Sequence, residues 1–165
     1  MHTGPVILGF DGTPASVWAV REAAALLAPR AALAVVVWEA GRNFQAATLP
    51  EKALELPPAT LDIRAAFEAE RAAYDDAQRL AEHGAALARE AGFQADGLAV
   101  ADDVTVADTL VRLARELDAQ AVVVGAHDHR GLTRLVPGRT LAGLLHKAPC
   151  PVMVCGRGGS QPPGR

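Results

Sequence analysis

Apolar residues follow two alternating patterns along this chain. Short uninterrupted runs, such as Ala32–Trp38, are typical of strands covered on both faces of a parallel sheet. Between them lie longer segments in which apolar residues recur every three or four positions, the spacing that buries one stripe of an α-helix. The predicted strands are Val6–Phe10, Ala32–Trp38, Gln94–Val100, Ala121–Gly125 and Pro151–Cys155.

The helical spacing predicts about four helices. Thr13 and Pro14 fit the cap and the first turn of the first helix, which should end near Pro29. The others are expected over residues 63–92, over residues 106–117 and in a short amphipathic segment after Gly138. Five strands alternating with helices predict an α/β fold, a doubly wound parallel sheet of five strands with right-handed connections.

The chain of 165 residues has the length of a single domain. Residues 39–61 contain three prolines and no steady period, which indicates an excursion with a mobile tip. Whether residues 42–62 cover a ligand site as a lid stays open. Glycine and proline are frequent at the end of the chain, so we expect one domain over residues 1–156 and a disordered tail over residues 157–165.

Charge and composition narrow the range of partners. A net charge of -3 and an aromatic content of 4% argue against nucleic acid as the main partner. No apolar run reaches the ~20 residues that cross a bilayer, so we expect no membrane segment. The first residues lack the features of a signal peptide, and Cys150 and Cys155 fit reduced strand residues, which predicts a cytoplasmic protein.

Ligands of doubly wound sheets bind outside the carboxyl ends of the strands, where strand order reverses. Two polar, glycine-containing loops follow strongly apolar strands at such ends. One is the loop Gly9–Thr13 after the first strand, and the other runs from Gly125 to Thr140 after the fourth. A strand that leads into a glycine loop and a helix N-terminus favours an anionic ligand, because free backbone N–H groups converge there.

Five segments of the chain carry a specific combination of motifs: Val6–Thr13, Val35–Glu39, Asp118–Gly125, Gly131–Gly138 and His146–Val154. Through these residues the chain resembles the universal stress protein family over nearly its whole length. The resemblance implies a Rossmann-like fold of the adenine nucleotide α-hydrolase type and a small stress-response module. It also implies ATP or AMP as the ligand, with magnesium bound through the phosphates, and a homodimer formed by antiparallel pairing of the last strand, Pro151 to Cys155.

In ATP-binding members of the family the phosphate loop has the pattern Gly-x2-Gly-x9-Gly-Ser/Thr, which falls here on Gly125, Asp128, Gly138 and Arg139. Asp128 places a carboxylate where the family has a bare backbone, which disfavours a triphosphate. Arg139 could bind phosphate, and Thr140, one position after the Ser/Thr of the family pattern, could supply the hydroxyl. Alternatively, Arg139 could pair with Asp128 and close the site. The two alternatives stay open.

The resemblance further implies that Asp11 approaches the adenosine and that the backbone of Val37 contacts the base. From the residues alone, Asp11 is also explained as a turn residue that binds its own backbone, a role compatible with ligand binding. For Val37 plain core packing is the favoured interpretation. Together with Gly9 and Thr13 of the first loop, these residues complete the predicted binding set.

Other chemistry has weak support in the sequence. His127-Asp128-His129 could supply metal ligands, but no distant third ligand other than Asp11 is evident, so a solvated loop is favoured. For His146 a position at a helix end is favoured over a catalytic base.

No nucleophile with a plausible base is visible, so turnover is not favoured beyond weak ATP hydrolysis. The alternative to nucleotide binding is a dimeric interaction protein with a degenerate loop.

Overall fold

The computed structural model describes residues 2–41, 63–126 and 138–156. The described elements, in chain order, are β1 (Val6–Gly9), α1 (Pro14–Leu27), β2 (Ala31–Trp38), α3 (Ile63–Glu90), β3 (Gln94–Ala101), α4 (Val106–Glu116), β4 (Ala121–Gly125), α5 (Arg139–Lys147) and β5 (Val152–Cys155). The predictions for residues 42–62, for His127, Asp128 and His129, and for the tail 157–165 lie outside the described residues. Every predicted strand and helix within the described ranges is present.

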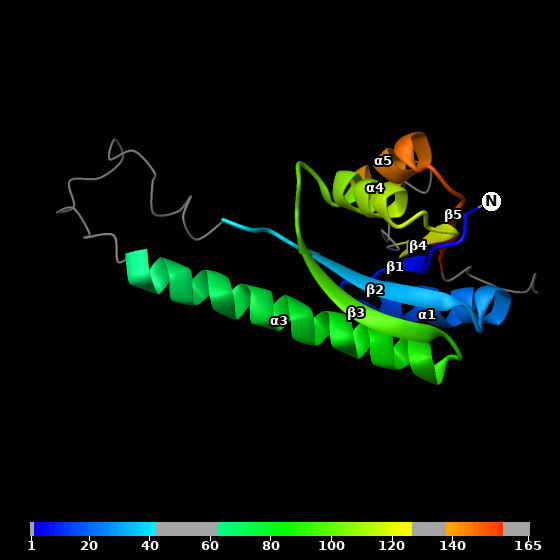
Figure 1. The fold of residues 1–165 in the computed structure, drawn as a ribbon, viewed down its shortest axis with the longest axis horizontal. Coiled ribbons are helices and arrows are strands. Elements are labelled where there is room, and N and C mark those ends of the chain that lie inside the picture. Colours follow the sequence, from blue (N-terminus) through cyan, green and yellow to red (C-terminus); the bar gives the residue numbers. More distant parts are fainter. Residues whose placement is uncertain (1, 42–62, 127–137, 157–165) are drawn as a thin grey trace, which may run out of the picture.

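The strands form a five-stranded parallel sheet of order β3-β2-β1-β4-β5. The chain moves outward from β1 to β3, then crosses back to β4 on the other side of β1, so strand order reverses between β1 and β4. Helices α1 and α3 cover one face, and α4 and α5 cover the other (Figure 1). The predicted doubly wound α/β fold is confirmed.

Two apolar clusters, one on each face of the sheet, form the core. The cluster under α1 and α3 contains Val6, Leu8, Phe10 and Val36, and it is rich in alanine from both helices and strands. The opposite cluster joins Ile7, Val35 and Val122 to apolar residues of α4 and to Leu144 of α5. The strands are therefore apolar on both faces, which explains why the runs in the sequence do not alternate.

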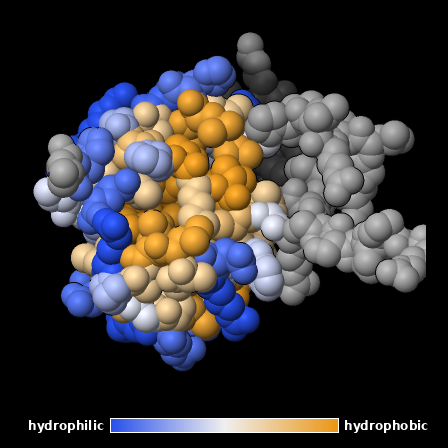
Figure 2. Space-filling model, turned by 90° about the vertical axis from the view of Figure 1, so that its right-hand side faces the viewer, coloured by the Kyte–Doolittle hydropathy of each residue, from blue (hydrophilic) through white to orange (hydrophobic). Residues whose placement is uncertain are grey.

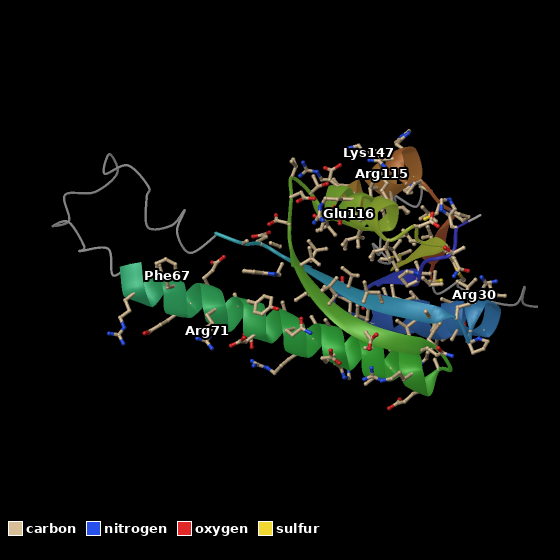
Figure 3. The ribbon with its side chains drawn as sticks, in the orientation of Figure 1. Arg30, Phe67, Arg71, Arg115, Glu116 and Lys147 are labelled. Atoms are coloured by element: carbon tan, nitrogen blue, oxygen red, sulfur yellow. The ribbon has the colours of Figure 1, made fainter. Side chains whose placement is uncertain are left out.

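Helix α3 is longer than the sheet beneath which it lies. Its second half packs against the sheet through small residues, among them Ala81, Ala85 and Ala88, each with none of its surface exposed. Its first turns extend beyond the carboxyl ends of the strands, where Phe67 is 62% exposed and Arg71 projects into solvent (Figure 3). The apolar spacing predicted the helix, but Phe67 and Tyr74 in its first half are exposed while Ala77, Ala81, Ala85 and Ala88 are buried.

Among the described residues, none of the helices combines the length and the apolar character needed to cross a membrane.

Candidate functional site

The strands end at unequal levels at the carboxyl edge of the sheet, and the step above the end of β1 is here called the crevice. The register pairs Gly9, the last residue of β1, with Val35, so β2 continues past β1 through Val36, Val37 and Trp38. On the other side, the last registered pair of β1 and β4 is Leu8 with Val123, and β4 continues to Gly125. Two longer strands thus flank the end of a shorter one at the point where strand order reverses, the place where doubly wound sheets bind ligands.

The backbone of Val37 faces this crevice. Phe10 N–H donates to the carbonyl of Val35 at 2.9 Å, whereas Asp102 N–H donates to the carbonyl of Trp38 at 2.9 Å. Backbone groups alternate sides along a strand, so those of Val37 point to the side of β1, beyond its last residue. Neither its N–H nor its C=O has a partner within the described residues. The half-buried Val37 side chain packs in the core against the α4 face.

The loop after β1 is organised by Asp11 and Thr13. One carboxylate oxygen of Asp11 accepts from the N–H of Thr13 at 3.0 Å and from its hydroxyl at 2.6 Å. Thr13 in turn caps α1, because its Oγ1 accepts from Ser16 N–H at 3.3 Å. Gly12 has a φ of +74°, which favours glycine. The expected Asx turn is present, and it holds the exposed Asp11 at the mouth of the crevice.

Gly125 brings the end of β4 against the first turn of α1, which follows this loop. A Cβ placed on Gly125 would lie 2.5 Å from the backbone C and O of Ala15 and 2.8 Å from the N of Ser16. The nitrogen of Asp11 lies 3.5 Å from the hydroxyl of Ser16. The end of β4 and the first turn of α1, which follows the loop after β1, therefore meet at one rim although they lie more than 100 residues apart in the chain.

A side chain at Gly9 would also be crowded, because a Cβ there would lie 3.1 Å from Cγ1 of Val124 and 3.6 Å from Cδ1 of Leu110. Leu110 of α4, which is 1% exposed, thus packs against the end of β1 at Gly9.

The N-terminus of α5 is open to solvent. Gly138 occupies the N-cap position with no side-chain cap, and Gly138 and Arg139 are exposed while Thr140 is half-buried. The first backbone N–H groups of a helix have no partner within the helix. In the part of the chain that is described, the guanidinium of Arg139 takes part in no ion pair or hydrogen bond. Asp128, the predicted alternative partner of this guanidinium, lies outside the described residues.

The pKa shifts of Cys150, Cys155 and Asp108 have structural causes. Both cysteines are free and buried, and burial raises the pKa of the thiols of Cys150 and Cys155, which keeps them protonated. The hydrogen bond from Lys147 is the main reason why the pKa of Asp108 is lowered. His146 lies in the last turn of α5, as favoured from the sequence. The described residues contain no group of three side chains suited to hold a metal ion.

Comparison with models of known protein families shows to which family the chain belongs. The family model described as "Universal stress protein family" matches residues 3–156, nearly the whole chain. The chain belongs to the universal stress protein family. The match covers both loops at the crevice and the strand β5, so the resemblance predicted from the motifs is confirmed. A comparison with curated protein sequences found no match.

Solved structures of universal stress proteins share the fold. One from Archaeoglobus fulgidus is 17% identical, with a TM-score of 0.67 over 92% of this chain and 98% of its own. A structure from Archaeoglobus fulgidus in complex with dAMP is 19% identical, with a TM-score of 0.56 over 93% and 98%. A family protein from Arabidopsis thaliana with AMP bound is 15% identical, with a TM-score of 0.58 over 98% and 97%.

Sequence reasoning missed that the backbone of Val37 has no partner among the described residues. The family motif pointed to this backbone, but residue type alone favoured core packing. A usable signal was the length of the apolar runs, because the first run is shorter than the second. Paired in parallel from a common start, the longer strand must project beyond the shorter one.

Proposed function

We propose that this universal stress protein binds an adenine nucleotide in the crevice at the carboxyl end of β1. The observation that carries the proposal is the backbone of Val37, which has no partner among the described residues. An N–H and a C=O on one strand residue match the donor and acceptor on the edge of an adenine ring. Support also comes from the family structures that hold dAMP and AMP.

Each predicted residue then has a place along the ligand. Val37 would contact the base, and the carboxylate of Asp11 would accept a hydrogen bond from the adenosine. The close contacts at Gly9 and Gly125 keep the crevice narrow, and Thr13 holds the loop of Asp11. The phosphates would face the uncapped N-terminus of α5, where Gly138, Arg139 and Thr140 lie.

The phosphate end of the site favours a nucleotide with few charges. Asp128 stands at a position where the family pattern has glycine, and like charges a few ångströms apart repel by about 1 kcal/mol even in water. We therefore expect AMP to bind at least as well as ATP. Magnesium would enter with the phosphates of the ligand, which would supply oxygen atoms of the kind it prefers.

Thermal unfolding in the presence of nucleotides tests this function. AMP, ADP and ATP, each with and without magnesium, should raise the midpoint of unfolding, while GMP at the same concentration should not. A ligand at 100 times its dissociation constant stabilises the fold by about 2.7 kcal/mol. Equal shifts with GMP and AMP would contradict base recognition by Val37, and no shift with any adenine nucleotide would contradict the proposed function.

The second candidate function is a dimeric interaction protein that holds no nucleotide. A specific observation supports the dimer. Val122 N–H donates to Pro151 C=O, and Ala126 N–H donates to Cys155 C=O, so the backbone groups of Val152 and Val154 point away from β4. Those groups have no partner within the described residues. An open, uncharged strand edge is a template for pairing with another chain.

Hydrophobic surface gathers on this side of the molecule. Figure 2 shows an apolar area bordered by hydrophilic residues, on the side where β5 and the end of α1 lie in Figure 1. Exposed apolar residues on these two elements are Leu26, which is 73% exposed, and Val154, which is 38% exposed. The arrangement supports a homodimer in which two copies of β5 pair, and the free cysteines are compatible with residence in the cytoplasm.

Replacement of Val154 by lysine is expected to convert the dimer into a monomer, because two charges would face each other across the paired strands. Sedimentation velocity over a range of protein concentrations measures the change. Val104→Lys is the matched control, since Val104 is 84% exposed in the loop after β3, at the opposite edge of the sheet. A wild-type protein that stays monomeric at every concentration would rule out this dimer.

A further inference from the structure

The two edges of the sheet differ in how their backbone is covered. Strand β3 forms one edge and β5 the other. Gln94 N–H donates to Arg30 C=O, and Asp102 N–H donates to Trp38 C=O, so the even-numbered residues of β3 face β2. The backbone groups of Ala95, Gly97 and Ala99 therefore point outward, away from the sheet.

Side chains of α3 bind these outward groups. The Oε1 of Gln78 accepts from Ala99 N–H at 3.1 Å, and its Nε2 donates to the carbonyl of Gly97 at 3.4 Å. Further along the helix, Nη1 of Arg89 donates to the carbonyl of Ala95 at 2.6 Å. Three consecutive outward-facing residues of the edge strand are thus engaged by two long side chains from the same helix.

The side-chain amide of Gln78 takes the place of a peptide. A neighbouring parallel strand would offer the edge one N–H and one C=O, which bind the carbonyl of one residue and the N–H of the residue two positions on. Gln78 offers the same pair of groups to Gly97 and Ala99. A carboxylate in its place could not donate, and an ammonium group could not accept.

The helix reaches the edge because β3 has a glycine at the contact. A Cβ on Gly97 would lie 2.7 Å from the backbone C of Ala81 and the N of Glu82, so α3 packs directly on the strand at this point. Figure 1 shows α3 running along β3 over most of the length of the strand. On β5, by contrast, Val152 and Val154 meet no such side chain within the described residues.

We propose that Gln78 and Arg89 close the β3 edge against pairing with a second copy of this chain. The proposal goes beyond nucleotide binding and needs neither a ligand nor the β5 dimer. Without the two side chains, β3 would present free backbone groups along an edge strand of eight residues. A sheet with two open edges can add copies without limit, because each copy then has a second interface that does not close on itself.

The double variant Gln78→Ala/Arg89→Ala tests the proposal. Its weight-average mass should rise continuously with concentration in light scattering and sedimentation, whereas the wild-type mass should reach a plateau. In the background of Val154→Lys, which blocks β5, the same double variant should form dimers through β3. In this second background any dimer must form through β3. The test of the β3 edge therefore gives a clear result even if the wild-type protein does not dimerise through β5.

Two single variants serve as controls for the double variant. Arg79→Ala removes a neighbouring exposed side chain of α3 that makes no contact with β3, and it should behave like the wild type. In Gln78→Ala alone, hydrogen exchange at Ala99 N–H should accelerate about fivefold, because this N–H loses one hydrogen bond. A folded double variant with the wild-type mass at all concentrations, or unchanged exchange at Ala99, would overturn the proposal.

Discussion

Alanine at position 125 is expected to lower the free energy of unfolding by about 1–3 kcal/mol, the usual cost of inserting a methyl group into a packed site. The added Cβ would lie 2.5 Å from backbone atoms of Ala15, and backbone cannot move aside as a side-chain tip can. Either β4 or the first turn of α1 must shift. Because these two segments form one rim of the crevice, nucleotide binding should weaken together with stability.

Gly138→Ala is the matched control for this effect. No atom lies within 4 Å of a Cβ placed on Gly138, and its φ is -54°, which alanine adopts readily. Chemical denaturation should therefore give nearly the wild-type stability for Gly138→Ala and a lower one for Gly125→Ala. Calorimetric titration with AMP then compares Gly125→Ala with the wild type. If Gly125→Ala keeps both stability and affinity, the close contact between β4 and α1 does not shape the site.

The second large effect is expected from Asp11→Ala, which should weaken adenine nucleotide binding by about 10- to 100-fold, the range of a hydrogen bond to a charged group. The carboxylate is proposed to accept from the adenosine while one of its oxygens holds Thr13 N–H and Oγ1. Loss of the turn contacts should also cost roughly 1 kcal/mol of stability.

Asp11→Asn separates the two roles of this side chain. An amide oxygen can still accept from Thr13, so the loop and the stability should be kept, whereas the charge that strengthens the bond to the ligand is gone. We expect affinity for AMP between those of the wild type and Asp11→Ala. Equal affinity in all three proteins, measured by calorimetry, would place the ligand away from the loop after β1.

Much of this molecule could be predicted from local patterns. The apolar runs located all five strands to within one or two residues, and Thr13, Pro29 and Gly92 marked helix ends that the structure reproduces within a few residues. These features depend on neighbours in the chain, so a window of sequence contains the information. The two polar loops could be placed at one rim because parallel strands joined by helices share a carboxyl edge.

The candidate site was predicted in part. The motifs named Asp11, Gly125 and Val37, and the structure places both Gly125 and the nitrogen of Asp11 close to Ser16 in the first turn of α1. Their roles in binding stay predictions. The reason for glycine at position 125 could not be foreseen, since it depends on a helix turn that lies more than 100 residues earlier in the chain.

The sequence by itself determined the order and type of the elements, the family and the two loops at the carboxyl edge. Only the tertiary structure decided that β2 and β4 extend beyond the end of β1. Among the described residues, it also decided that the backbone of Val37 is left without a partner, and that α3 covers the β3 edge while the β5 edge is uncovered. The reason is that register and edge position depend on contacts between segments distant in the chain, which no local period of hydrophobic residues encodes.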